Sequence, residues 1–311
     1  MKLRIKVTGV CILLALGIVV LLLNTQSRDA FSSTYNDNTS VLTKLNVSNV
    51  APWVINPVVY KQGTPAGNNI VLEEGTTINV RCNATINDTN GVNDISSVNA
   101  TFYLSGYTGA ADYNTLYKNT SCTQVYQISN IAAYYSCNFQ VWYFANNGTW
   151  ECNMTALDTG GLSNYSVAQN IIDPLYAINL STTEIDFGEL DPGQSSTDQV
   201  VNVTNFGNMN LTIAVKGYGV TDGDGWAMNC TVGNISIGYE RYALDPGIAW
   251  DSMTQLTSSF TNIAGLTVYQ RVDDNDNAMI NSTNSTYWKI KAPLGTRGQC
   301  NGTLVFSAVA T

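Results

Sequence analysis

Cysteine and carboxylate side chains are the groups in this sequence with the most reactive chemistry, because the chain contains no histidine. Without histidine it cannot build the Ser-His-Asp or Cys-His arrangements that activate a nucleophile, or the mixed Cys/His sites that bind zinc. Two carboxylates suffice for glycoside hydrolysis, but no stretch concentrates acids with aromatic residues as a sugar cleft would. We therefore expect a protein that binds and is not an enzyme.

Two acidic loops have the composition of a calcium site. Asp222 and Asp224 alternate with glycine, and Asp273 and Asp276 lie in an Asp-Asp-Asn-Asp-Asn run. Both loops place hard oxygen ligands on short segments, as Ca²⁺ requires. Neither matches an EF-hand, since an alanine replaces the loop glycine of the second and an asparagine its bidentate glutamate. The alternative is that Asp, Asn and Gly simply form turns here.

Six of the seven cysteines lie beyond the apolar N-terminal run, and an even number in an exported chain favours disulfides. The pairing follows from matched strand faces and from keeping each bridge within one domain. The predicted pairs are Cys82 with Cys152, Cys122 with Cys137, and Cys230 with Cys300. The first and last are expected to cross a sandwich core, and the second to close a local loop.

The N-terminal segment Met1–Leu23 places three cations ahead of an apolar run. Val7–Leu23 is 17 residues long, at the lower end of what crosses the ~30 Å apolar core of a bilayer. The positive-inside rule leaves the N-terminus in the cytoplasm and the C-terminal ectodomain outside. Small residues at a cleavage site are scarce, so we expect an uncleaved single-pass anchor in the cell membrane. Pilin-like cleavage after Gly9 is the alternative.

The residues beyond Leu23 carry 11 Lys and Arg against 23 Asp and Glu, a formal charge of about −12. That charge excludes a nucleic-acid-binding surface. Seventeen Asn-x-Ser/Thr sequons predict an N-glycosylated surface. The sequon asparagines are Asn38, Asn46, Asn83, Asn87, Asn99, Asn119, Asn147, Asn153, Asn164, Asn179, Asn202, Asn210, Asn229, Asn234, Asn281, Asn284 and Asn301. This density, with few cations and no lipobox or wall-sorting signal, resembles archaeal surface proteins.

Composition and periodicity divide the remaining chain into three parts. Residues 24–52 are polar, lack an apolar period and predict a stalk. Residues 53–173 and 174–311 contain short β-type runs broken by Gly, Asn and Asp, and Asp173-Pro174 marks the change between them. The predicted fold class is all-β, with two tandem sandwich domains behind one transmembrane helix.

Strict alternation defines the inward faces of three strands in the first domain. The expected core residues are Ile78, Val80, Cys82, Ala84 and Ile86, then Val98, Ala100, Phe102 and Leu104, then Trp150, Cys152, Met154 and Ala156. Asn83, Asn99 and Asn153 then point outward, where a glycan has room. In the second domain Val201, Val203, Leu211, Ile213 and Val215 form the inward set, with Asn202 and Asn210 outside.

The first domain resembles an immunoglobulin-like domain. The resemblance rests on inward Cys82 in an early strand, inward Cys152 near the end, and Asn-Gly-Thr-Trp-Glu-Cys before the latter. It implies a sandwich with a bridge between its sheets. Trp150 takes the place of the family's tyrosine two residues before the second cysteine. Phe102 or Tyr103 takes the place of the core tryptophan on the third strand.

The second domain resembles the sandwich domains of the ASH and major sperm protein group. The residues that carry this resemblance are Phe187-Gly188, Pro192-Gly193 and the strand that ends in Asn205-Phe206-Gly207-Asn208. The resemblance covers the first third of the domain and implies an interaction module without catalytic residues.

Two function classes follow from these features. The first is a membrane-anchored, glycosylated surface protein whose sandwiches bind protein or glycan partners, including another copy. The second is a subunit of a filament or surface lattice in which the N-terminal helix is a packing element. Sequon-poor segments at 107–135 and 238–276 are the expected contact surfaces, with Tyr239, Tyr242, Trp250, Phe260 and Tyr269 in the second. The alternative is that these aromatic residues form the core of the second domain.

Overall fold

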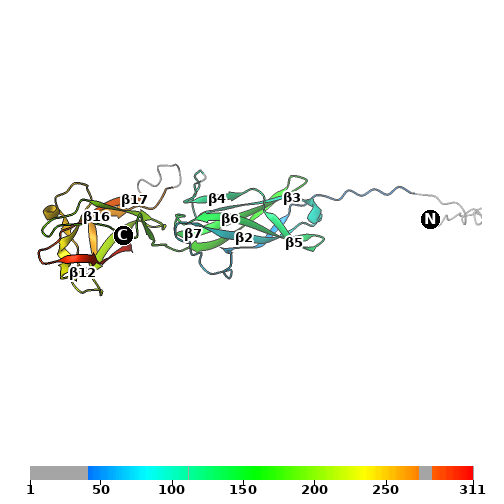
Figure 1. Cartoon of the computed structure of the whole chain (residues 1–311). Helices are drawn as coiled ribbons and strands as arrows, with labels where there is room; N and C mark the ends of the chain where they lie inside the picture. Colours follow the sequence, from blue (N-terminus) through cyan, green and yellow to red (C-terminus); the bar gives the residue numbers. More distant parts are fainter. Residues whose placement is uncertain (1–40, 111, 273–281, 311) are drawn as a thin grey trace, which may run out of the picture. The chain divides into compact units, whose positions relative to one another are not determined.

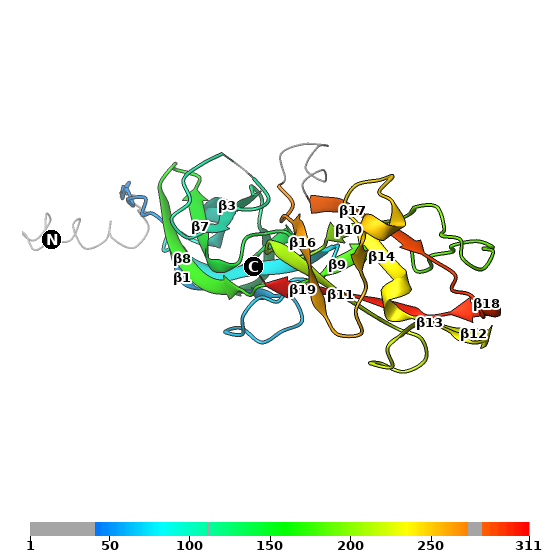
Figure 2. The same ribbon diagram turned by 90° about the vertical axis from the view of Figure 1, so that its left-hand side faces the viewer.

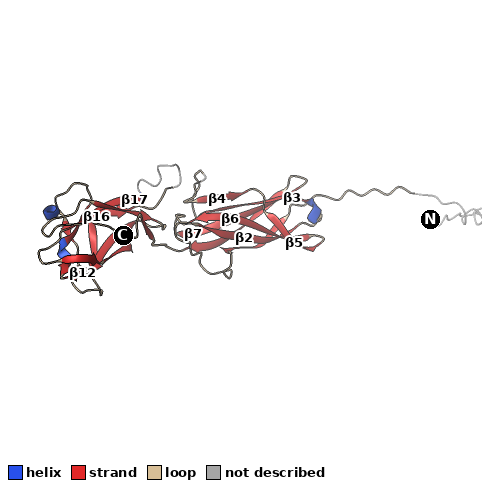
Figure 3. Cartoon of the chain, viewed as in Figure 1, coloured by secondary structure: helices blue, strands red, loops and turns tan. Residues whose placement is uncertain are grey.

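Strands account for nearly all regular structure in the described part of the chain (Figures 1 and 3). The computed structural model describes residues 41–110, 112–272 and 282–310. The predicted membrane anchor Met1–Leu23 lies outside these ranges. Within them, no helix combines the length and the apolar composition that crossing a membrane demands. Described residues from Asn49 onward belong to one unit, whereas 41–48 belong to another and are exposed without a strand.

The first sandwich consists of two four-stranded antiparallel sheets. The Cys82 sheet has the order β1-β2-β6-β5 and contains β1 (Trp53–Lys61), β2 (Thr77–Asn87), β6 (Ala132–Trp142) and β5 (Thr123–Ser129). The Cys152 sheet has the order β4-β3-β7-β8 and contains β4 (Leu116–Asn119), β3 (Ile95–Leu104), β7 (Gly148–Asp158) and β8 (Ser163–Ile172). Immunoglobulin domains place strands A, B, E and D in one sheet and C, F and G in the other. The first sandwich has this order, with β4 added beside β3.

The predicted alternation is found on all three strands of the first core. The buried side chains are Ile78, Val80, Cys82, Ala84 and Ile86 on β2, Val98, Ala100 and Phe102 on β3, and Trp150, Cys152, Met154 and Ala156 on β7. Leu104, also predicted to be inside, is only partly buried and packs against this core. Phe102, not Tyr103, occupies the core position, and its ring packs on Trp150 with centroids 4.7 Å apart. Two aromatic rings therefore fill the space beside the disulfide between the sheets.

The two sheets meet at one edge, where β1 and β8 lie side by side (Figure 2). The amide Nδ2 of Asn170 on β8 donates to the carbonyl of Val59 on β1 at 2.9 Å. Asn170 is buried, so this hydrogen bond replaces water on both groups. At this edge a side-chain hydrogen bond joins β1 and β8, which are not paired by backbone hydrogen bonds.

All three predicted disulfides are confirmed as pairs. Cys82–Cys152 joins β2 to β7 and crosses the core between the sheets, as expected. Cys230–Cys300 does not cross a core. Its two cysteines are directly opposite each other on neighbouring strands, with Cα atoms 3.9 Å apart. The prediction of its location was wrong because alternation reports which face a residue takes, not which strand becomes its neighbour.

The prediction that Asn83 is exposed was also wrong. Asn83 lies on the face of β2 away from the core, as predicted, but it is only 4% exposed. Its Nδ2 donates to the hydroxyl of Tyr60 on β1 at 2.7 Å. Because β2 is an interior strand, the Tyr60 side chain of neighbouring β1 can reach across its outer face and contact Asn83. Asn99 and Asn153 are half-buried on their outward faces.

The described residues of the second region form three antiparallel sheets. The five-stranded sheet has the order β15-β14-β17-β10-β9 and contains β15 (Thr254–Gln255), β14 (Glu240–Ala243), β17 (Thr283–Ile290), β10 (Gln199–Asn205) and β9 (Ile178–Leu180). The other two contain β16 (Thr261–Val268), β11 (Leu211–Tyr218) and β19 (Thr303–Ala310), and β13 (Asn234–Ser236), β12 (Trp226–Val232) and β18 (Arg297–Asn301). The predicted inward set on β10 and β11 is buried around Trp288.

Asn208 fixes the connection between the two sandwiches. Its Nδ2 donates to the carbonyls of Ala145 and Asp173 at 3.0 and 3.1 Å, and its Oδ1 accepts from the amide of Leu175 at 2.6 Å. A Cβ on neighbouring Gly207 would overlap the Leu175 carbonyl. The Asn-Phe-Gly-Asn sequence, which carried a family resemblance, therefore has a local structural role. The predicted boundary at 173–174 falls beside these contacts.

Candidate metal centre

Asp224, predicted as a calcium ligand, has both carboxylate oxygens engaged by backbone amides. The donors are Gly219 (3.1 Å) and Trp226 (2.9 Å) to Oδ1, and Val220 (2.7 Å) and Thr221 (3.1 Å) to Oδ2. These hydrogen bonds, that from Val220 foremost, lower the pKa of Asp224. The carboxylate organises its own turn, as the turn interpretation of this loop predicted.

Of the other predicted calcium ligands, only Asp222 lies among the described residues. Asp222 makes an ion pair with Lys216. Asp273 and Asp276 lie outside the described residues. The acidic loops chosen from the sequence thus give no assembled cation site in the part of the chain that the structure describes.

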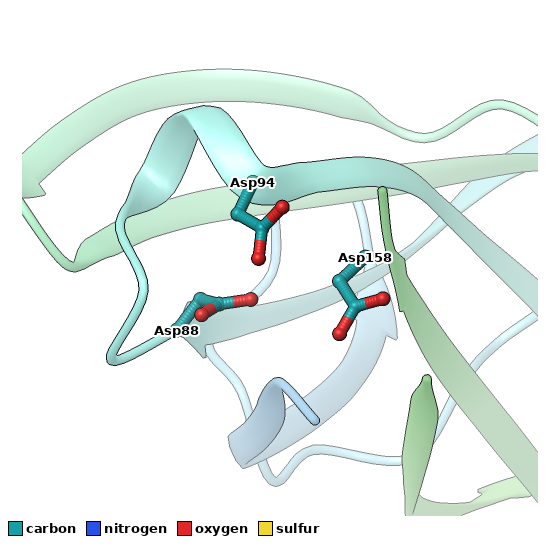
Figure 4. Close-up of side chains that lie close together, drawn as sticks. All are labelled: Asp88, Asp94 and Asp158. Atoms are coloured by element: carbon teal, nitrogen blue, oxygen red, sulfur yellow. The ribbon is translucent and has the colours of Figure 1, made fainter. Parts of the chain in front are cut away.

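Three aspartates that the sequence analysis did not single out do come together. Asp88, Asp94 and Asp158 each place a carboxylate oxygen within 4.8 Å of the other two. Figure 4 shows the three side chains directed toward a common space. Asp88 is 0% exposed and Asp158 2% exposed, whereas Asp94 is half-buried. We call these residues the aspartate cluster.

Each aspartate is positioned by the end of a regular element. Asp88 directly follows β2, Asp158 is the last residue of β7, and Asp94 is the last residue of the short 3-10 helix η1 (Val92–Asp94) that leads into β3. The pairing of β3 with β7 aligns Ile95 with Asp158, which places Asp94 beside it. Between Asp88 and η1, Gly91 has a φ of 118°, which a residue with a side chain rarely adopts.

Hydrogen bonds fix the orientation of two of the carboxylates. The Oδ1 of Asp158 accepts from the amide of Leu162 at 2.7 Å, and its Oδ2 accepts from the Nδ2 of Asn49 at 2.9 Å. The Oδ1 of Asp94 accepts from the hydroxyl of Thr159. Asn49 precedes β1, so the cluster also holds the chain where it enters the sandwich.

Asp88 is the carboxylate with an unused oxygen. Its Oδ1 accepts from the amide of Asn90 at 2.8 Å, but its Oδ2 is fully buried and has no hydrogen-bond partner. None of the ion pairs formed by described lysines and arginines involves Asp88, Asp94 or Asp158. Burying an ionised carboxylate without a partner costs several kcal/mol. The cluster therefore combines high negative charge with oxygen ligands and no cationic side chain.

The loop that carries Asp88 and Asp94 also contacts the turn between β5 and β6. The amide of Asp88 donates to the carbonyl of Ile131 at 2.7 Å, and the amide of Val92 donates to the carbonyl of Asn130 at 2.9 Å. One loop thus connects the aspartate cluster to the exposed β5–β6 hairpin.

A spacing in the sequence could have revealed this cluster. Asp88 follows Cys82 by six residues, and Asp158 follows Cys152 by six residues. Strands B and F of an immunoglobulin-like sandwich, here β2 and β7, run in the same direction. Residues that follow the two bridged cysteines by the same number of positions therefore lie at the same end of the core. The predicted disulfide and the family resemblance together therefore contained the signal for two of the three residues.

The aromatic residues predicted to form a contact surface in the second region differ in their exposure to solvent. Tyr242 is 4% exposed and packs on Trp288 with centroids 5.2 Å apart, so it belongs to the core. Trp250 is half-buried, with the guanidinium of Arg241 3.8 Å from its ring centroid. Phe260 and Tyr269 are exposed. The prediction of a surface role is wrong for Tyr242, because its strand β14 lies inside the five-stranded sheet.

The predicted contact segment 107–135 contains an exposed apolar hairpin. Tyr117 and Tyr135 are buried, but every residue of β5 is exposed. The exposed apolar side chains are Val125, Tyr126, Ile128 and Ile131, which we call the hairpin patch. β5 is the last strand of its sheet, and bulges interrupt its pairing with β6 near Val125 and Ile128. Val125 and Ile128 have no Cα partner on β6 at these two interruptions, and both side chains are exposed.

A groove of about 1250 Å³ lies in the second region. Residues between 179 and 192 line it together with Met228, Ile235 and Ile290. Glu240, also in the lining, is buried, and burial raises its pKa to about 8. The groove has a mixed polar and apolar lining, in which Glu184, Asp186 and Glu189 accompany the buried Glu240.

Comparisons with known proteins give no family assignment. No family model matches the chain, and no curated protein matches it. Among solved structures, a complex of the chaperone CsuC with the tip adhesion subunit CsuE from Acinetobacter baumannii is 8% identical, with a TM-score of 0.39, covering 78% of this chain and 96% of that chain. The C-terminal domain of the Streptococcus pyogenes antigen I/II-family protein AspA is 10% identical, with a TM-score of 0.26. The match covers 85% of this chain and 100% of that chain. A carbohydrate-binding module of the β-sandwich superfamily is 12% identical, with a TM-score of 0.25. The match covers 85% of this chain and 98% of that chain. TM-scores this low support no functional argument.

Proposed function

We propose that this protein is a membrane-anchored surface protein that binds and does not catalyse. The observation that carries the proposal is the pairing of all six cysteines beyond the apolar N-terminal run. Disulfides persist in oxidising compartments outside the cytoplasm. The apolar run Val7–Leu23 with its preceding cations supports retention in the membrane, with the sandwiches outside.

The hairpin patch is the surface through which we propose that two copies of the chain associate. Strand β5 contains no charged residue, in a chain with a formal net charge of −9. A second copy would therefore bring an equally uncharged surface, without the like-charge repulsion that the rest of the chain would cause. Pairing of the same patch on both copies also closes the assembly as a two-fold dimer.

Fractionation and N-terminal sequencing of the native protein test the anchor. Recovery in membranes with Met1 or Lys2 at the N-terminus supports it, together with digestion of the sandwiches by protease added to intact cells. A mature N-terminus at Val10 would instead favour the filament subunit, and one near Ser27 a secreted protein.

Sedimentation of the detergent-solubilised full chain tests the association. We expect a dimer for the native protein and a monomer for the Val125→Lys/Ile128→Lys variant, because equal charges then face each other across the two-fold axis. Both side chains are exposed, so the melting temperature should not change. Leu294→Lys, at a residue 82% exposed, is the matched control. A native protein that is monomeric, or a variant that still dimerises, overturns this role of the hairpin patch.

A further inference from the structure

We propose that Asp88, Asp94 and Asp158 bind one Ca²⁺ ion. This proposal is independent of the binding partner and of the membrane anchor. Its first support is position, because the three carboxylates converge from three separate elements within 4.8 Å of one another. Such a convergence brings like charges together, which folding would avoid unless a positive charge is shared among them.

The unused oxygen of Asp88 points to a ligand of this cluster. The Oδ2 of Asp88 is buried and lacks a hydrogen-bond partner. The Asp88 carboxylate lies beside those of Asp94 and Asp158 (Figure 4). Buried polar atoms of folded proteins are nearly always satisfied by protein, water or a bound ion. Among three neighbouring carboxylates a cation satisfies this oxygen and also offsets the repulsion between like charges. The described lysines and arginines form no ion pair with the cluster. A bound cation supplies the missing charge.

The ligand chemistry selects calcium among the common cations. The cluster offers carboxylate oxygens, and the chain has no histidine and no free described cysteine that would favour zinc or copper. Ca²⁺ takes six to eight oxygens in flexible geometry, which at least one oxygen from each of the three carboxylates supplies together with waters. Mg²⁺ requires near-ideal octahedral geometry and retains its own water, so we expect it to bind more weakly.

The position of the cluster indicates what bound calcium does. Asp158 holds Asn49, and the loop from Asp88 to Asp94 holds the β5–β6 turn through Ile131 and Asn130. An ion shared by the three aspartates would therefore fasten the start of the sandwich and this hairpin to both sheets at once.

Calorimetric titration of the purified full chain, stripped with chelator and titrated with CaCl₂, tests the proposal. We expect one ion per chain, with a dissociation constant no weaker than the ~10⁻⁴–10⁻³ M range of extracellular calcium modules. Asp94→Asn should weaken binding by at least about tenfold, because a charged ligand is lost. Asp222→Asn, which removes an exposed carboxylate, and Asp273→Asn/Asp276→Asn, in the other acidic loop, should bind as the native chain does.

Melting temperatures with and without calcium provide a second readout. Without calcium, Asp94→Asn should melt at the same temperature as the native chain or higher, because one repelling charge is gone. With calcium, the native chain should melt several degrees higher and the variant should gain little, so their order reverses. Asp158→Asn should behave in the same way if it folds. Native protein that binds no calcium at about 10 mM, roughly tenfold above the weakest dissociation constants of such modules, overturns the proposal. Equal binding after Asp94→Asn overturns it as well.

Discussion

Cys82 and Cys137 are directly opposite each other on the neighbouring strands β2 and β6, yet neither is bonded to the other. Cys82 pairs with Cys152 across the core, and Cys137 pairs with Cys122 from the segment before β5. Both Cys82 and Cys137 are 0% exposed and share the inner face of the sheet. The two disulfides therefore lie next to each other in the core. Each of these two cysteines is bonded to a more distant partner and not to the cysteine opposite it.

Removing the two outer partners should allow the neighbouring thiols to pair. In the Cys122→Ala/Cys152→Ala variant we expect Cys82 and Cys137 to form a disulfide, because opposite residues of an antiparallel pair lie ~4.5–5.5 Å apart between Cα atoms, within disulfide range. Peptide mapping without reduction would identify the cross-linked fragments. Two free thiols per chain after oxidation would show that strand geometry forbids this bridge.

Burial of Glu240 should make the protein less stable as the pH rises. Its pKa is raised from 4.5 to about 8 in the folded state by loss of solvent. Between these values the folded chain binds more protons than the unfolded chain, so the free energy of unfolding falls with pH, by at most about 1.4 kcal/mol per pH unit. Urea unfolding of Glu240→Gln between pH 5 and 8 should show a flatter dependence. Exposed Glu184→Gln is the control, and parallel curves for both variants would refute this role of Glu240.

Gly160 should be required for the hydrogen bond between Asn49 and Asp158. A Cβ at residue 160 would overlap the Nδ2 of Asn49 and lie 3.4 Å from the Oδ1 of Asp158. We expect Gly160→Ala to cost about 1 kcal/mol, the usual worth of such a hydrogen bond. Asn49→Ala should cost the same, and the double variant no more than either alone. Additive losses in denaturant unfolding would mean that the two residues act separately.

Loss of the Asn208 side chain should loosen the connection between the sandwiches. Asn208→Ala leaves the carbonyls of Ala145 and Asp173 and the amide of Leu175 without their partner. Each unsatisfied buried group costs about 1–3 kcal/mol. We expect faster proteolysis near 173–176 in the variant, with both sandwiches surviving as fragments. Asn164→Ala, at an exposed asparagine, is the control, and equal cleavage of both variants would contradict the proposed role.

Burial should also decide which sequons carry glycans in the native protein. Asn83 is covered and its Nδ2 donates to Tyr60, so we expect no glycan there. Asn164 and Asn301 are exposed and should be occupied. Glycopeptide mass spectrometry of protein from its native source makes the comparison. A glycosylated Asn83 in folded protein would require the outer face of β2 to be open.

Much of the first sandwich was decided by local pattern. Alternation of apolar residues determined which face of β2, β3 and β7 is buried, because successive side chains of a strand must point in opposite directions. Placing Cys82 and Cys152 on those faces, and keeping each bridge inside one domain, was enough to predict all three disulfides. The residues that set the turns, such as Asp224, were likewise recognisable from their type.

What only the tertiary structure decided was which strands become neighbours. Period-two alternation does not report lateral order, so Cys230 and Cys300 were placed across a core although their strands pair directly. For the same reason the sequence did not predict that Tyr60, on the neighbouring strand β1, covers Asn83. The sequence did not predict the aspartate cluster either, because Asp94 reaches Asp88 and Asp158 only after strands from both sheets have packed together. A charge cluster of this kind depends on distances between elements, and those arise when the sheets pack.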